Sequence, residues 1–139
     1  MKTIAELIAA IDRHRAPGAT ARQGCTKAEI DWLVRFSPIP LNTDYLNFMR
    51  AAGHGCGRVI SENLVYEFQY LEGMNRVAWE LPSMQPNTFT FLKNVNISHY
   101  YFKYDAATKT ETLWAYVDEH LPLKDSFLTF IMAVFEWKW

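Results

Sequence analysis

Residues 100–117 read YYFKYDAATKTETLWAYV, two runs of β-forming residues on either side of a short polar stretch. Tyr100–Tyr104 and Glu111–Val117 are rich in aromatic and β-branched side chains, which favour strands. Asp105–Lys109 lies between them and has the composition of a hairpin turn. The pattern predicts two neighbouring antiparallel strands in the second half of the chain.

Further strands are expected before this hairpin. Arg58–Ile60, Leu64–Leu71 and Phe89–Leu92 are short and rich in β-formers. Apolar and polar residues alternate in Leu64–Leu71, which suits a half-buried strand, although the same residues leave a helix open. Residues 73–87 are expected to be irregular or briefly helical, and Pro122 is expected to end the sheet region.

Apolar residues that recur every three or four positions predict amphipathic helices on both sides of this region. Thr26 and Glu29 have the spacing of a capping box, and Asn42 is a favourable N-cap. Gly53 should end the helix that begins at Asn42, because glycine tolerates a left-handed cap. The expected helices cover residues 3–15, 26–36, 43–52 and 126–136. Helices, then strands, then a helix predict an α+β fold with an antiparallel or mixed sheet flanked by N-terminal helices and a C-terminal helix.

Composition agrees with one globular domain. The 139 residues are 50% hydrophobic and 15% aromatic, enough for a sizeable core. We assign residues 1–139 to a single domain, with residues 1–25 as an N-terminal helix and loop extension. The core is expected to contain Leu33, Phe48, Met49, Phe102, Trp114, Phe127 and Phe130.

Charge and hydropathy restrict the classes of partner. The net charge is −1 and no run approaches the roughly 18 apolar residues of a membrane span, so we expect neither direct nucleic-acid binding nor a membrane. We find no signal peptide and expect a cytoplasmic protein in which Cys25 and Cys56 are free thiols.

Gly53-His54-Gly55-Cys56-Gly57 is the stretch most suggestive of chemistry. Its glycines follow a predicted helix and precede a predicted strand, the reverse of a phosphate-binding or dinucleotide-binding loop, so we interpret it as a helix-to-strand turn. A metal needs three or four converging ligands, whereas His54 and Cys56 form at most half of a site. No nucleophile motif is found, and we expect no metal, no cofactor and no enzymatic activity.

A family resemblance rests on the order of several short motifs. Residues 39–49, IPLNTDYLNFM, resemble the LP-x-DY-x-x-FL helix of the SUKH superfamily, the Smi/Knr-like proteins. Ser98-His99 stands where the family often has a Gly-Asp pair. The other motifs that are similar to the family's, in order, are Thr26–Phe36 with Glu29, Gly53–Gly57, Phe102–Asp105, Leu113–Val117 and Asp125–Ile131.

The resemblance implies a small α+β domain that acts by binding other proteins. Most bacterial members are similar to immunity proteins that bind and block a toxin domain of the nuclease or deaminase class, and fungal relatives are regulatory interaction hubs. We therefore expect a non-catalytic immunity protein, a monomer or weak homodimer, whose partner is a basic, nuclease-like toxin domain. The alternative is a regulatory or scaffold domain with no toxin partner.

The expected contact surface follows from charge. Residues 59–139 carry a net charge of −4 and residues 1–58 carry +3, so the acidic part should attract a basic partner. We also expect Trp137 and Trp139 to dock onto the body of the domain. The candidate partner-binding residues are Glu62, Glu67, Tyr70, Glu72, Trp79 and Glu80.

Overall fold

The computed structural model describes the chain except residues 1–2, 82–83, 85–86, 96 and 137–139, so the expected docking of Trp137 and Trp139 lies outside the described residues. The fold is α+β, as predicted. The helices are α1 (Ile4–Arg13), α2 (Lys27–Phe36), α3 (Thr43–Ala52), α4 (Phe68–Trp79) and α5 (Phe127–Glu136). The strands are β1 (Leu64–Val65), β2 (Thr88–Asn94), β3 (Ser98–Asp105), β4 (Thr110–Tyr116) and β5 (His120–Leu123).

The sheet is an antiparallel meander in the order β1-β2-β3-β4-β5. The predicted hairpin is confirmed as β3 and β4, with Asp105 paired to Thr110 across the turn. The expectation that Pro122 ends the sheet is wrong, because Pro122 lies within β5 opposite Trp114. Proline is tolerated there because β5 is an edge strand, where a missing N–H breaks no further ladder bond.

The segment before β2 differs most from the prediction. Only Leu64–Val65 of the expected strand 64–71 pairs with the sheet, and α4 begins at Phe68 and continues through residues expected to be irregular or briefly helical. The buried side chains Leu71, Met74 and Ala78 have helical spacing, and this stripe outweighs the short alternation that precedes it. Arg58–Ile60 forms no strand; Arg58 itself has a positive φ of 60°.

Helix α4 covers the part of β2 that β1 does not reach. β1 pairs only with the last two residues of β2. The buried Asn75 amide donates to the carbonyl of Thr90 at 2.9 Å and accepts from its N–H at 2.7 Å. Trp79, one turn further along α4, donates its indole N–H to the carbonyl of Thr88 at 3.0 Å. These bonds satisfy backbone groups of β2 that would otherwise be left at an exposed strand edge.

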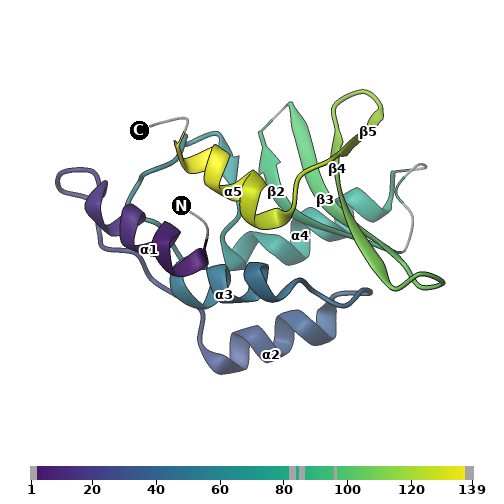
Figure 1. The fold of residues 1–139 in the computed structure, drawn as a ribbon, viewed down its shortest axis with the longest axis horizontal. Coiled ribbons are helices and arrows are strands. Elements are labelled where there is room, and N and C mark those ends of the chain that lie inside the picture. The colour runs from purple at the N-terminus through teal and green to yellow at the C-terminus, as the bar shows by residue number, and fades with distance from the viewer. Residues whose placement is uncertain (1–2, 82–83, 85–86, 96, 137–139) are drawn as a thin grey trace.

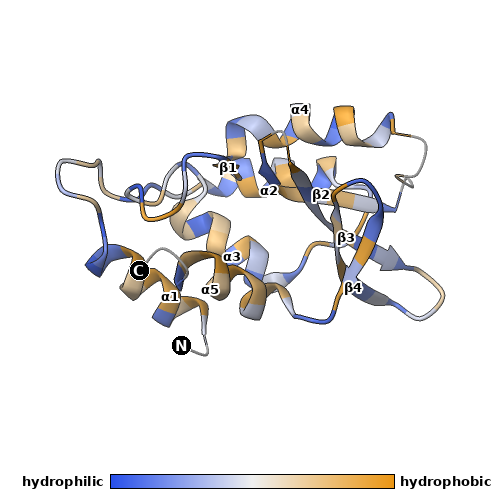
Figure 2. Cartoon of the chain, turned by 90° about the horizontal axis from the view of Figure 1, so that it is seen from above, coloured by the Kyte–Doolittle hydropathy of each residue, from blue (hydrophilic) through white to orange (hydrophobic). Residues whose placement is uncertain are grey.

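The main core lies between the sheet and helices α3 and α5, and α1 packs against these two helices on the side away from the sheet (Figure 1). The buried Tyr45 ring of α3 lies 5.5–6.1 Å from the rings of Phe89, Phe91, Phe102 and Phe127. Leu7 and Ile11 of α1 are also fully buried. Figure 2 shows apolar and polar residues alternating along α1 and α4, as expected for helices with one buried side.

Five of the seven predicted core residues are confirmed, since Leu33, Phe48, Met49, Phe102 and Phe127 are buried. Trp114 and Phe130 are only partly buried, and each packs against the edge of a core cluster. Trp114 packs with Tyr101 on the other face of the sheet, below the amino group of Lys103. Phe130 lies against Tyr100 at the side of a surface depression, because it sits at the margin of the buried stripe of α5.

The predicted helix signals are largely confirmed. Thr26 and Glu29 form a complete capping box at the start of α2, and the Asn42 side chain caps α3. Gly53 ends α3 without a left-handed conformation, since its φ is −65°. A glycine is needed there for space, because a Cβ would lie 2.3 Å from the Cys25 sulfur and 2.6 Å from the Met49 carbonyl oxygen. In the part of the chain that the structure describes, no helix is long and apolar enough to cross a membrane.

Candidate functional site

The structure gathers most of the candidate partner-binding residues around α4. Tyr70, Glu72 and Trp79 lie on the helix, and Glu67 and Glu80 occupy its N-cap and C-cap positions. Glu62 lies in the loop before β1. Burial separates them: Tyr70, Glu62 and Glu80 are exposed, whereas Glu67, Glu72 and Trp79 are partly buried.

Two of these residues have structural roles within the domain. The Glu67 carboxylate accepts the N–H of Tyr66 at 3.2 Å at the start of α4, where a negative charge also favours the helix dipole. Trp79 uses its indole N–H on β2. Glu67 therefore stabilises the start of α4, and Trp79 holds α4 against the sheet.

A groove runs between α2 and α4, and we call it the α2–α4 groove. Its volume is about 410 Å³. Trp32 stacks on Phe36 at 4.7 Å and meets the edge of Phe68 at 5.6 Å, so aromatic rings line the contact between the two helices. The residues that line the groove are Ala28, Glu29, Trp32, Phe68, Gln69 and Glu72.

The surface beside this groove already holds a cation of the chain itself. The guanidinium of Arg76 lies 5.6 Å above the Phe36 ring and pairs with Glu72 at 3.5 Å. An aromatic face together with a carboxylate is a favourable environment for a guanidinium. Further round α4, Tyr70 and Val77 are 50% and 57% exposed, on either side of Gly73, so the outer face of the helix is partly apolar.

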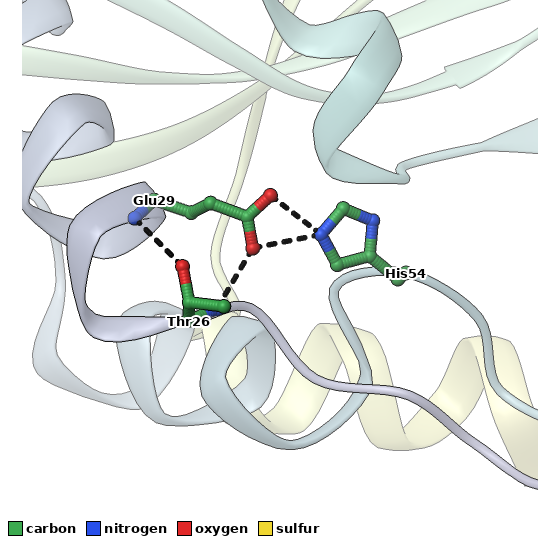
Figure 3. A network of polar contacts seen from close by, with 3 residues as sticks. All are labelled: Thr26, Glu29 and His54. Atoms are coloured by element: carbon green, nitrogen blue, oxygen red, sulfur yellow. Dashed lines mark hydrogen bonds and ion pairs between the residues drawn. The ribbon is translucent and has the colours of Figure 1, made fainter.

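A polar cluster lies at the start of α2, where the capping box meets the glycine-rich turn (Figure 3). Nε2 of His54 lies 2.9 Å and 2.8 Å from the two carboxylate oxygens of Glu29. Oε1 of Glu29 also accepts the backbone N–H of Thr26 at 2.8 Å. The Thr26 N–H, followed by the His54 ring, holds the pKa of the Glu29 carboxyl below its ordinary value.

Cys25 lies beside this pair. One ligand atom from each of Cys25, Glu29 and His54 lies within 4.8 Å of the other two. Burial, together with the Glu29 charge, raises the pKa of the Cys25 thiol to about 12, so in this state it is a neutral thiol and a poor nucleophile. We name Cys25, Glu29 and His54 the Cys-Glu-His cluster.

The sequence had paired His54 with Cys56, and the structure gives it different neighbours. Cys56 is buried, and burial raises the pKa of its thiol. Both cysteines are free thiols, as expected. The sequence signal for this cluster was the four-residue spacing of Cys25 and Glu29. Because this spacing crosses the start of α2, both side chains lie at the same end of that helix.

The glycine-rich turn is fixed by backbone bonds to two other segments. His54 donates its N–H to the Gln23 carbonyl at 2.8 Å, and Gln23 donates to the Gly55 carbonyl at 3.1 Å. Phe68 at the start of α4 donates to the Gly53 carbonyl at 2.8 Å. The interpretation as a turn after a helix holds, but the expected strand does not follow it. This bonding fixes the backbone of His54, and the contacts with Glu29 and Phe68 place its ring.

Another group of titratable side chains lies on the sheet face that carries Tyr101. The Tyr101 hydroxyl bonds to Nδ1 of His120, and the rings of His99 and His120 flank Tyr116. Burial, followed by the charge of a nearby lysine, lowers the pKa of both histidines. The hydrogen bond and the ring contacts join β3, β4 and β5 on this face of the sheet.

Comparison with protein-family models, curated proteins and solved structures gives no match. The assignment to the Smi/Knr-like proteins therefore rests on the sequence motifs, and it enters below as a proposal.

Proposed function

We propose that this chain is a non-catalytic immunity protein of the Smi/Knr-like type, which neutralises a basic toxin domain by covering it. The observation that carries the proposal is the α2–α4 groove, an aromatic-lined groove with Glu29 and Glu72 at its sides. Toxins that act on nucleic acid carry arginine and lysine side chains at the surface that meets the phosphates. Such a side chain fits an aromatic face flanked by carboxylates, as Arg76 does beside the groove.

The outer face of α4 supports the same contact. Tyr70 offers a half-exposed aromatic ring, and tyrosine is among the residues that contribute most at protein interfaces. Glu72 and Glu80 lie on the same helix and its cap, and their charge would steer a basic partner towards this face. Glu67 is left out of the contact, because it does not line the groove and its carboxylate bonds the Tyr66 N–H at the start of α4.

The test begins with co-purification of this chain with the candidate toxins encoded beside its gene. Association with the bound toxin is then measured against salt for wild type and for the double variant Glu72→Lys/Glu80→Lys. Because electrostatic steering raises association rates about 10–1,000-fold, we expect the double variant to associate at least about tenfold more slowly at low salt. The difference should shrink as salt screens the charges.

The matched control is Glu119→Lys/Glu136→Lys. These two acids are exposed and lie outside α2 and α4, and their reversal changes the net charge by the same amount. We expect it to associate nearly at the wild-type rate. If both double variants slow association equally, the α2–α4 face is not the contact, and if no neighbouring toxin binds, the immunity function is wrong.

A further inference from the structure

The Cys-Glu-His cluster has the composition of a metal site. It offers a sulfur, an imidazole nitrogen and a carboxylate oxygen, the three ligand types that zinc takes in proteins. Calcium and magnesium prefer oxygen ligands alone, so the cysteine argues against both. Three protein ligands leave one position of a tetrahedral zinc for a water molecule or another ligand.

The positions of the three side chains suit a common centre. Their ligand atoms already lie within 4.8 Å of one another, whereas ligand atoms around a tetrahedral zinc lie about 3.3–3.6 Å apart. The sulfur would move inward, and the Glu29 oxygens and His54 nitrogen, now 2.8–2.9 Å apart, would separate slightly. The side chains of Glu29 and His54 are each 27% exposed, so an ion can enter from solvent.

The surrounding bonds orient these ligands from outside the cluster. The Thr26 N–H holds Oε1 of Glu29, and the backbone N–H groups of Cys25 and His54 bond to the carbonyls of Met49 and Gln23. The Thr26 bond is an outer contact of the kind that orients a ligand in metal sites, and the two backbone bonds fix the segments that carry Cys25 and His54. Gly53 adds the space for the sulfur, since a Cβ there would lie 2.3 Å from it.

We infer that Cys25, Glu29 and His54 form a zinc site with one open coordination position. Zinc binding breaks the S–H bond of Cys25 and the Nε2–H bond of His54, and the freed electron pairs form the Zn–S and Zn–N bonds. The thiol proton passes to solvent, and the neutral imidazole keeps one proton, on Nδ1. The Glu29–His54 hydrogen bond is replaced by two metal–ligand bonds, so zinc would tie the start of α2 to the glycine-rich turn. This inference does not depend on the proposed immunity function, and it replaces the expectation of no metal that the separated histidines suggested.

The test is metal binding to the full chain after treatment with a chelator. Zinc is titrated in competition with a chromophoric chelator, and cobalt is used in its place to record the absorption band of a thiolate–cobalt bond. We expect one metal per chain and a thiolate–cobalt band. Because loss of an outer partner already weakens metal affinity about 10–100-fold, loss of a direct ligand in Cys25→Ser or His54→Gln should weaken it at least about 100-fold.

Cys56→Ser is the matched control, because it removes the other thiol and leaves the cluster intact. It should keep the stoichiometry, the affinity and the cobalt band of the wild type. A chain that binds neither metal overturns the inference, as does a cobalt band that survives in Cys25→Ser and disappears in Cys56→Ser. If His54→Gln does not fold, the comparison of the two serine variants still decides, since Cys25→Ser keeps the Glu29–His54 bond.

Discussion

Asn75 should be one of the most stabilising polar residues of the domain, and its replacement by leucine tests how α4 is held on the sheet. The side chain is fully buried and makes three hydrogen bonds, two with the backbone of Thr90 and one with the Leu71 carbonyl. Leucine has a similar volume, so Asn75→Leu leaves little cavity. It would, however, leave the N–H and the carbonyl of Thr90 buried without their partner.

The expected cost follows from these two groups. A buried backbone group without a partner costs about 1–3 kcal/mol, so two of them cost about 2–6 kcal/mol, less a gain of about 1 kcal/mol from the added apolar surface. We expect the free energy of unfolding to fall by about 3 kcal/mol in urea denaturation, and the Thr90 amide to lose protection from hydrogen exchange. Gln69→Leu, an exposed change on the same helix, should stay within about 0.5 kcal/mol of wild type. A loss below about 1 kcal/mol for Asn75→Leu at an unchanged m-value would refute the assignment of these bonds.

Two further measurements test the core and a half-buried acid. Phe135→Ala should lower the free energy of unfolding by about 3–5 kcal/mol, because Phe135 is fully buried. Phe130→Ala should lower it by about half of that, because the Phe130 ring is only partly buried. Equal losses in the two variants would contradict this difference in burial. Burial raises the pKa of Glu111 to about 7, so the folded state holds that proton more tightly than the unfolded state and stability should fall as pH rises from about 4.5 to 7. Glu111→Gln should remove this loss, with a gain of about 1–2 kcal/mol over wild type at pH 8 and little change at pH 4, measured by urea denaturation at both values.

The sequence predicts those parts of the fold that depend on local signals. The capping box at Thr26, the cap at Asn42 and the hairpin turn at Asp105 each act within four residues, and each is found where it is expected. The sequence predicts helix α4 only as an alternative to a strand, because its first residues alternate like one. The hydrogen bonds that hold this segment on the sheet as a helix run from Asn75 and Trp79 to β2, and they join residues 9 to 15 positions apart.

In the candidate sites, too, the sequence predicts local features and not the contacts between distant residues. Proximity along the chain suggested His54 with Cys56, but successive residues of a tight turn point in different directions. Among the described side chains that could ligate a metal, Cys25 and Glu29 are the ones that gather with His54. The sequence did not predict the aromatic lining of the α2–α4 groove, because residues 64–71 were expected to form a strand. Trp32 contacts Phe68 because Phe68 begins a helix beside α2. Composition had identified the acidic region, and tertiary structure shows which of its acids are already bonded within the chain.

Glu29 belongs to both proposed surfaces, and this determines which variants can separate them. Its carboxylate lines the α2–α4 groove, completes the capping box of α2 and bonds to His54. Substituting it would weaken the helix start, the metal site and the groove charge together, so a loss of toxin binding in such a variant would have three causes. Cys25→Ser changes only the cluster, and Glu72→Lys/Glu80→Lys changes only the α4 side. If the first variant loses zinc and keeps toxin binding, and the second loses toxin binding and keeps zinc, the two sites can be separated by mutation although both use the Glu29 carboxylate.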